Sequence, residues 1–427
     1  MHKEQITHAT TGEQYTKIVL DSGLTVLCYP VEGYSIAHAV FATDFGSVDR
    51  KFTVDGKQYE IPAGTAHFLE HKMFENEDGK DAFELYAQTG ASANAFTSFD
   101  KTCYIFTASD KIDESLDILL SFVSNPYFTK ETVQKEQGII AQEIKMYDDS
   151  AEWRMFFALL SGMYQNSFVK DDIAGTVESI GELTPELLYS CTDAFYNPSN
   201  MILSIAGNIT EEQVLRACEK AGLYESKINP VLVKILEDEP PDVAKRENVF
   251  AMEVAQPLLG LAFKETAILR EERLKYEFMA DILIELIIGE TTELYRQLHD
   301  EGLINPSFEG DVLSGEGYFS IFFAGETENP DKVQEMLLNE IAKVKKQGVS
   351  ADDFEVCKNV LYGECITELE SMSSVATNVA TAHLKKFNYF NVIDTLASIK
   401  LDDVNETCKE WFDTEKMVKV VITPREV

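Results

Sequence analysis

The chain has 427 residues, more than one ordinary hydrophobic core organises, and its length therefore predicts two or three domains. Hydrophobic residues make up 45% and charged residues 26% of the sequence, a balance that excludes a disordered chain. The formal net charge of -36 argues against nucleic acid and anionic membranes as partners, because both repel a negative surface.

The N-terminal segment 1–14 is polar and lacks the apolar stretch that a signal peptide requires. No run of the sequence approaches 18 uninterrupted apolar residues, so no membrane-spanning helix is expected. The seven cysteines are odd in number, widely spaced and without a C-x-x-C pair, which indicates reduced core residues. We therefore expect a cytoplasmic protein.

Strands and helices are mixed in the first half without strict βαβ alternation, which favours an α+β sandwich over a doubly wound sheet. Thr65 is expected to cap the helix that starts near it. Strands are expected at 17–20, 24–30, 37–47, 91–99, 102–109 and 200–209. Helices are expected from 65, at 82–90, 111–125 and 129–149, from 151, and at 185–196 and 210–222.

The second half repeats a similar order of elements after a charged, proline-containing segment at 226–248 that is typical of a linker. Strands are expected at 249–264, 307–313, 317–325 and 416–424, and helices at 272–289, 291–302, 330–347 and 351–386. The sequence thus predicts two homologous α/β-sandwich domains, each a mostly antiparallel sheet packed with helices. These are a metal-bearing domain at 1–225 and a domain without the metal motif at 249–427.

Segment 64–71 contains the clearest chemical signal. His67 and His71 are four residues apart, so on a helix both imidazoles lie on one face and can converge on one ion. Glu70 lies at the edge of that face, in the inverted order of the H-E-x-x-H motif. Zinc with three protein ligands keeps a fourth position for water, whose proton an adjacent glutamate can accept.

An ordinary helix with histidines on its polar surface is the alternative. Phe68 and Leu69 argue against it, because they make the segment half apolar and its helix is expected to be buried. A third ligand is expected from 129–149, where Glu136 and Glu143 are seven residues apart on one face. One would bind the metal and the other would orient a histidine, although each alone is compatible with an ordinary surface glutamate.

Four segments occur together in the first 210 residues. They are H-F-L-E-H at 67–71, N-A-F-T at 94–97, E-x6-E at 136–143 and Y-N-P-S-N-M at 196–201. In this order they resemble the pitrilysin/insulysin and mitochondrial-processing-peptidase family of zinc peptidases. The longer run H-F-L-E-H-K-M-F-E is similar to a bacterial YmfH-type subgroup. The family's two homologous α+β domains agree with the duplication predicted above.

This resemblance implies a catalytic centre with one zinc ion per chain. The ligands would be His67, His71 and Glu143. Glu70 would be the general base, and Glu136 would support the site from outside the ring of ligands.

The resemblance also implies that the substrate adds as a β-strand to an edge strand of the sheet. The residues concerned are Asn94, Ala95, Phe96 and Thr97. Main-chain pairing binds any extended peptide, while pockets beside alternate side chains provide sequence preference. An ordinary sheet strand is the alternative that the sequence leaves open.

The second half departs from the family pattern. Active members place an Arg, and a Tyr several residues later, around a G-L-x-Y turn that holds the substrate carbonyl. In the corresponding run, 298–305, Asn305 occupies the Tyr position and Leu298 or His299 the Arg position. Because the family includes heterodimers that divide metal and Arg/Tyr pair between subunits, we expect this chain to be a metal-bearing subunit or to form a homodimer.

We therefore predict a zinc-dependent endopeptidase that hydrolyses oligopeptides or short unfolded segments. The acidic charge is compatible both with a solvated surface and with a cavity that attracts basic peptides. The alternative function is a zinc-retaining structural or assembly subunit of a heteromeric complex. Glu70 argues against that alternative, since a structural zinc site needs no general base and closes its fourth position. Manganese or cobalt could replace zinc in vitro.

Overall fold

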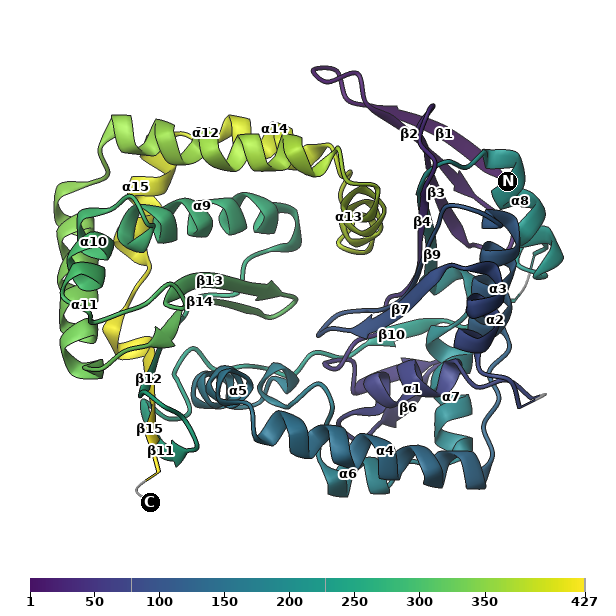
Figure 1. The fold of residues 1–427 in the computed structure, drawn as a ribbon, viewed down its shortest axis with the longest axis horizontal. Helices are drawn as coiled ribbons and strands as arrows, with labels where there is room; N and C mark the ends of the chain where they lie inside the picture. Colours follow the sequence, from purple (N-terminus) through teal and green to yellow (C-terminus); the bar gives the residue numbers. More distant parts are fainter. Residues whose placement is uncertain (78, 227, 426–427) are drawn as a thin grey trace. The chain divides into compact units, whose positions relative to one another are not determined.

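The structure, a computed structural model, describes residues 1–77, 79–226 and 228–425. It is built from β-sheets and helices in the α+β arrangement predicted from the sequence (Figure 1). Within the described ranges, no helix combines the length and the apolar character needed to span a bilayer.

Strands and helices are mixed along the first half of the chain. Its strands are β1 (His2–Thr7), β2 (Gln14–Val19), β3 (Thr25–Pro30), β4 (Ala37–Thr43), β5 (Lys51–Val54), β6 (Lys57–Glu60), β7 (Ser92–Thr97), β8 (Thr102–Ala108) and β9 (Met201–Gly207). Its helices are α1 (Thr65–Met73), α2 (Ala82–Thr89), α3 (Ile112–Ser124), α4 (Lys130–Asp148), α5 (Ala151–Met163), α6 (Val177–Gly181), α7 (Pro185–Phe195) and α8 (Glu211–Lys220).

The second half has a similar order of strands and helices. Its strands are β10 (Leu232–Lys234), β11 (Glu247–Met252), β12 (Leu258–Lys264), β13 (Glu309–Gly315), β14 (Tyr318–Glu326) and β15 (Met417–Pro424). Its helices are α9 (Arg270–Ile288), α10 (Glu293–Asp300), α11 (Pro330–Gln347), α12 (Ala351–Glu368), α13 (Met372–Leu384), α14 (Asn391–Ser398) and α15 (Leu401–Glu410).

One strand arrangement occurs twice. The seven-stranded sheet has the order β1-β2-β3-β9-β4-β8-β7, and the five-stranded sheet has the order β11-β15-β12-β14-β13. In both sheets a parallel pair, β3 with β9 or β11 with β15, is followed by antiparallel strands only. This repeated topology confirms the predicted duplication. The first unit also contains a small separate sheet, β10-β5-β6.

The chain packs into two units, each assembled from three segments. The first unit contains 1–144, 172–235 and 366–391, and the second contains 145–171, 236–365 and 392–427. This grouping differs from the predicted domains, because α5 belongs to the second unit and α13 to the first. The physical reason is packing: α5 contacts β12 and β15, whereas α13 contacts β4 and β9 (Figure 1). The expected linker 226–248 is likewise divided between the units.

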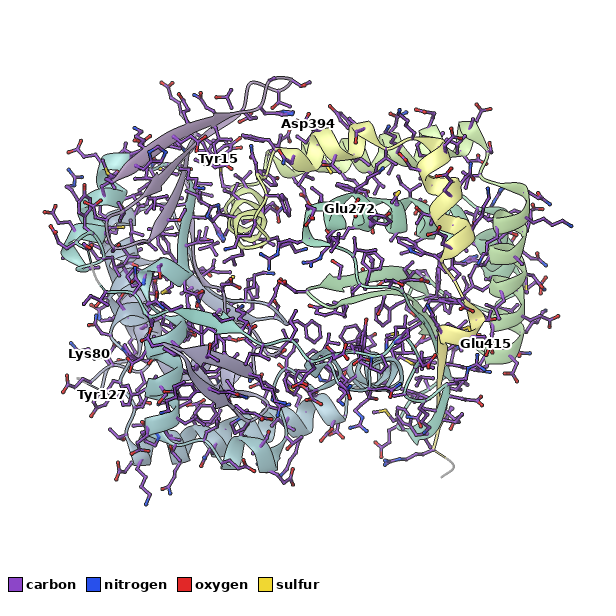
Figure 2. All side chains as sticks on the ribbon, turned by 180° about the vertical axis from the view of Figure 1, so that it is seen from behind. Tyr15, Lys80, Tyr127, Glu272, Asp394 and Glu415 are labelled. Carbon is purple, nitrogen blue, oxygen red and sulfur yellow. The ribbon has the colours of Figure 1, made fainter. Side chains whose placement is uncertain are left out.

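The exchanged helices are held by specific contacts inside their units. After α13, the ring of Phe390 stacks on the ring of His8 with centroids 5.4 Å apart. The hydroxyl of Tyr15, labelled on β2 in Figure 2, donates to Asn388 Oδ1 at 3.1 Å. In the second unit, a Cβ on Gly260 of β12 would come within 2.4 Å of the sulfur of Met155. This glycine therefore allows α5 to approach the sheet closely.

Two local expectations were wrong. Thr65 does not cap α1, because its hydroxyl donates to the carbonyl of Pro62 at 2.7 Å and Gly64 is the N-cap residue. Gly64 has φ 84, and a Cβ there would lie 2.4 Å from the carbonyl oxygen of Ala174. The expected helix 351–386 is two helices, because the helical conformation ends after α12 and the side chain of Ser371 caps the start of α13.

Asp281 on α9 is a half-buried carboxyl group near other acids of the second unit. Burial first, and then the charges of Glu277, Asp311 and Glu364, raise its pKa from 3.8 to about 7. Between these two values the folded protein keeps a proton that the unfolded protein has lost. This group therefore stabilises the folded state least at high pH, and stability falls as the pH rises through this window.

We expect Asp281→Asn to be more stable than the wild type by a margin that increases by about 2 kcal/mol between about pH 5.5 and pH 8.5 and is constant above. Urea unfolding followed by tryptophan fluorescence measures this difference in stability. Both tryptophans, Trp153 and Trp411, belong to the same unit as Asp281. Asp300→Asn is the matched control, because the Asp300 side chain is 84% exposed. A margin that does not change with pH would contradict the expectation.

Candidate metal centre

Helix α1 places His67 in the interior of the first unit and leaves His71 half-buried. It packs against β7 and β8, with Phe68 and Leu69 fully buried in the core. His67 is 8% and Glu70 9% exposed. Polar side chains buried to this degree are costly unless they have partners, which here come from α4 and β7.

Helix α4 brings a carboxylate to both imidazoles. Glu143 Oε1 lies 3.7 Å from His67 Nε2, and Glu143 Oε2 lies 3.4 Å from His71 Nε2. Two ligands that each lie about 2.1 Å from a tetrahedral zinc ion are about 3.4 Å apart. One ligand atom from each of the three residues lies within 4.8 Å of the others, and the described part of the chain contains no other such group of His, Cys, Asp or Glu.

The protonation state of His67 suits a metal. Burial first, and then the neighbouring His71, lower the pKa of His67 to about 4, so this imidazole is neutral near pH 7. The neutral imidazole is the form that binds zinc. The donor set of two imidazole nitrogens and one carboxylate thus fits a zinc ion with an open position for water.

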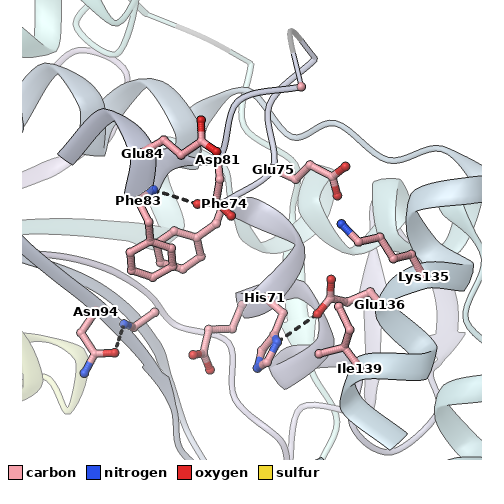
Figure 3. A pocket seen from close by; sticks show the side chains of 13 residues that line it. His71, Phe74, Glu75, Asp81, Phe83, Glu84, Asn94, Lys135, Glu136 and Ile139 are labelled. Atoms are coloured by element: carbon pink, nitrogen blue, oxygen red, sulfur yellow. Dashed lines mark hydrogen bonds and ion pairs between the residues drawn. The ribbon is translucent and has the colours of Figure 1, made fainter. Parts of the chain in front are cut away.

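Glu136 is not one of the three ligands but contacts the imidazole of His71. Its Oε1 lies 3.1 Å from His71 Nδ1 (Figure 3). The other ring nitrogen, Nε2, lies 3.4 Å from Glu143 Oε2. Burial lowers the pKa of His71, but the hydrogen bond with Glu136 and the charges of Glu143 and Glu70 outweigh burial and raise it overall. Such a carboxylate partner fixes both the orientation and the tautomer of a ligating imidazole.

Glu70 lies beside the ligand set and is held by a hydroxyl group. Thr97 Oγ1 on β7 donates to Glu70 Oε2 at 2.6 Å. Burial raises the pKa of Glu70, and the hydrogen bond from Thr97 partly opposes that rise. A buried carboxylate next to a metal position is placed to accept a proton. The contact with Thr97 was missed from the sequence, which suggested only a substrate-binding strand at this position.

The four residues expected to bind substrate lie in β7, at the edge of the seven-stranded sheet. Asn94 and Ala95 pair with Ile105 and Tyr104 of β8. The opposite edge of β7 has no neighbouring strand among the described residues of this sheet. Phe96 and Thr97 complete the strand. The structure therefore has the edge strand that the substrate prediction requires, and substrate binding itself stays a prediction.

A cavity of about 560 Å³ opens next to Glu70 and His71 (Figure 3). One wall is the stacked pair Phe74 and Phe83, whose ring centroids are 4.4 Å apart. Phe83 is 47% and Ile139 46% exposed, so apolar surface is accessible in this cavity. Charged side chains also line the cavity, namely Glu75, Asp81, Glu84, Lys135 and Glu136.

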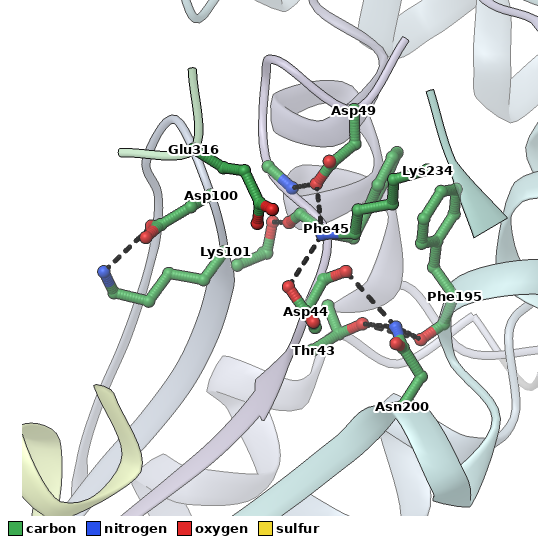
Figure 4. Close-up of polar contacts among 12 residues, drawn as sticks. Thr43, Asp44, Phe45, Asp49, Asp100, Lys101, Phe195, Asn200, Lys234 and Glu316 are labelled. Atoms are coloured by element: carbon green, nitrogen blue, oxygen red, sulfur yellow. Dashed lines mark hydrogen bonds and ion pairs between the residues drawn. The ribbon is translucent and has the colours of Figure 1, made fainter. Parts of the chain in front are cut away.

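The loop after β4 is hydrogen-bonded to the end of the edge strand β7. Lys234 of β10 donates to Asp44 Oδ1 at 2.7 Å and to Asp49 Oδ2 at 2.8 Å (Figure 4). The backbone N–H of Ser47, within this loop, donates to the carbonyl of Ser98 at 3.0 Å, just beyond β7. These partly buried ion pairs therefore help to fix the position of the turn between β7 and β8.

The Y-N-P-S-N-M segment, 196–201, connects elements of the first unit by hydrogen bonds. The hydroxyls of Tyr196 and Tyr104 lie 2.8 Å apart in the interior. Asn200 Nδ2 donates to the carbonyl of Phe195 at 2.9 Å and lies 3.4 Å from Thr43 Oγ1 (Figure 4). These contacts connect α7, β8 and the start of β9.

The run 298–305 lies in the second unit, in and after α10. Leu298 is fully buried, and the side chain of His299 is 53% exposed. Asn305 Nδ2 donates to Glu326 Oε2 at 2.5 Å, and Asn305 Oδ1 accepts from the N–H of Ser307 at 2.8 Å. Asn305 thus stabilises the local turn.

Family models match most of the chain. Residues 55–177 match the model described as "Insulinase (Peptidase family M16)", and residues 182–361 match "Peptidase M16 inactive domain". The first match contains His67, His71 and Glu143.

Curated relatives match over nearly full length. The uncharacterized zinc protease YmfH of Bacillus subtilis is 35% identical over 95% of this chain and 96% of its own length. The uncharacterized zinc protease YmxG of the same species is 25% identical over 86% of this chain and 91% of its own length.

Solved structures share the fold. An M16-like peptidase from Alicyclobacillus acidocaldarius has a TM-score of 0.93 and 32% identity, covering 100% of this chain and 99% of its own. Pitrilysin has a TM-score of 0.73 at 15% identity, covering 100% of this chain and 47% of its own, which is a likeness of fold alone.

Proposed function

Because the chain belongs to peptidase family M16, we propose that it is a zinc-dependent endopeptidase acting on oligopeptides or short unfolded segments. One observation carries the proposal. His67, His71 and Glu143 present three ligand atoms to one point, while Glu70, which is buried, lies beside them without being part of the set. A site that only stabilised the fold would not need this additional carboxylate.

Each side chain has a defined task in this proposal. A zinc ion held by the three ligands would polarise the scissile carbonyl and acidify a water molecule. Glu70 accepts the proton of the attacking water and delivers it to the leaving amine. Glu136 keeps the imidazole of His71 in the orientation and tautomer that bind the metal.

The edge strand and the cavity support a role in holding an extended peptide. The free edge of β7 offers main-chain donors and acceptors to any sequence, and the neighbouring cavity admits one side chain. Carboxylates outnumber ammonium groups on the cavity wall, which supports a preference for basic peptides. Raised salt is expected to weaken the binding of such peptides.

We also propose that a second subunit completes the substrate site, either a homologue that carries the Arg/Tyr pair or another copy of this chain. The support is the run 298–305, where Asn305 occupies the Tyr position and is engaged with Glu326. Full hydrolytic activity of the purified chain as a monomer would contradict this proposal.

The test is to measure bound zinc and hydrolysis of a quenched peptide library with the same preparation. We expect one zinc ion per chain and hydrolysis that is lost after chelation and restored by added zinc. Added magnesium is the control, because it prefers oxygen ligands and should not restore activity. Hydrolysis that survives complete zinc removal would contradict the proposal, and zinc without hydrolysis would favour the assembly subunit.

A further inference from the structure

We infer that Thr97 is a positioning residue for Glu70, an inference that rests on the proposed function. Its hydroxyl, on the last residue of β7, donates to Glu70 Oε2 at 2.6 Å. A hydrogen bond with an ionised acceptor is about twice as strong as a neutral one. Thr97 therefore holds the general base in addition to its place in the strand expected to bind substrate.

The surrounding hydrogen bonds fix the direction of this contact. Thr97 Oγ1 also lies 3.4 Å from Thr102 Oγ1 on β8. Thr102 already donates its only hydroxyl proton to the carbonyl of Phe45 at 2.9 Å. The proton of Thr97 is thus directed to Glu70, whose carboxyl oxygen is the closer acceptor.

The frame around Thr97 is rigid. Thr97 pairs with Thr102 in the ladder of β7 and β8, and the N–H of Ser98 donates to the carbonyl of Lys101 at 2.8 Å to close the turn. The Ser47–Ser98 backbone bond described above holds the same turn from the side of the β4 loop. A hydroxyl fixed in this way can restrict Glu70 to one rotamer.

Two consequences follow for the reaction. With Oε2 occupied by Thr97, Oε1 of Glu70 is the oxygen left to accept the proton of water. The hydroxyl also connects the base directly to the strand that would hold the peptide backbone. The distance between base and scissile bond is then set by β7, and a displacement of 1 Å at such a site can lower the rate about 100-fold.

The experiment compares Thr97→Val, which removes the hydroxyl and keeps the shape, with Thr97→Ser, which keeps the hydroxyl. We expect Thr97→Val to lower kcat about 10- to 100-fold with little change in KM or zinc content, and Thr97→Ser to retain most of the activity. In the Glu70→Gln background, Thr97→Val should cause no further loss, because the base is already absent. Thr53→Val, on β5 of the separate small sheet, is the matched control.

A crystal structure of the zinc-loaded protein supplies a readout without hydrolysis. We expect Thr97 Oγ1 within hydrogen-bonding distance of Glu70 in the wild type, and a displaced or disordered Glu70 carboxylate in Thr97→Val. An unchanged Glu70 in the variant would overturn the inference even if the wild type hydrolyses no peptide. So would unchanged kcat, or a change in KM alone, while leaving the proposed peptidase function intact. Absence of wild-type hydrolysis would instead count against the function.

Discussion

Replacing Glu70 with glutamine should lower kcat by about 100- to 10,000-fold while one zinc ion per chain stays bound. Glutamine has the size of glutamate but cannot accept the proton of the attacking water. Glu70 is buried beside the ligands and makes its described hydrogen bond with Thr97, so the metal-binding atoms of His67, His71 and Glu143 are unchanged. Steady-state kinetics with a quenched peptide, together with metal analysis, measure both quantities.

Peptide binding by the same variant separates chemistry from folding. A fluorescent peptide should bind Glu70→Gln about as tightly as it binds the wild type, because β7 and the cavity keep their contacts. If the variant lost its zinc, the fall in rate would not identify Glu70 as the base. If it kept both zinc and full activity, Glu70 would not be the base.

Replacing Glu136 and Glu143 of α4 with glutamine should lower the zinc affinity by different amounts. Glu143→Gln removes the carboxylate that lies 3.4 Å from His71 Nε2 and 3.7 Å from His67 Nε2. Glu136→Gln removes only the partner of His71 Nδ1. We expect zinc affinity to fall about 10- to 100-fold for Glu136→Gln and by more than that for Glu143→Gln.

Competition with a chromogenic chelator measures these affinities on one scale. Glu131→Gln is the matched control, since Glu131 is an exposed glutamate in the first turn of the same helix. The control should bind zinc like the wild type. Equal losses for the variants at 136 and 143, or a larger loss at 136, would contradict the assignment of Glu143 as the ligand.

Sequence spacing anticipated the local geometry of the site. Residues four apart on a helix share a face, and His67 and His71 have ring centroids 4.7 Å apart. Residues seven apart do so as well, and Glu136 and Glu143 both reach His71. The spacing of these two glutamates suggested that 129–149 supplies the third ligand, and the family resemblance then assigned the metal to Glu143.

Other features depend on contacts that no local pattern encodes. Thr97 and Glu70 are 27 residues apart, and a threonine at the end of a strand gives no sign of which carboxylate it meets. Strands β1, β5 and β6 went unpredicted because they are short and include many charged or polar residues, and β1 is exposed along most of its length. The helix exchange was missed because the apolar faces of α5 and α13 indicate burial but not which sheet buries them.

That exchange constrains how such a gene can be divided. The six segments alternate between the units, so the chain passes from one unit to the other five times. A fragment that ended in 226–248 would contain α5 without β12 and β15, and would leave β4 and β9 without α13. Neither half could complete its hydrophobic core alone. A viable split gene would therefore have to express both pieces together, as fragments that fold by completing each other.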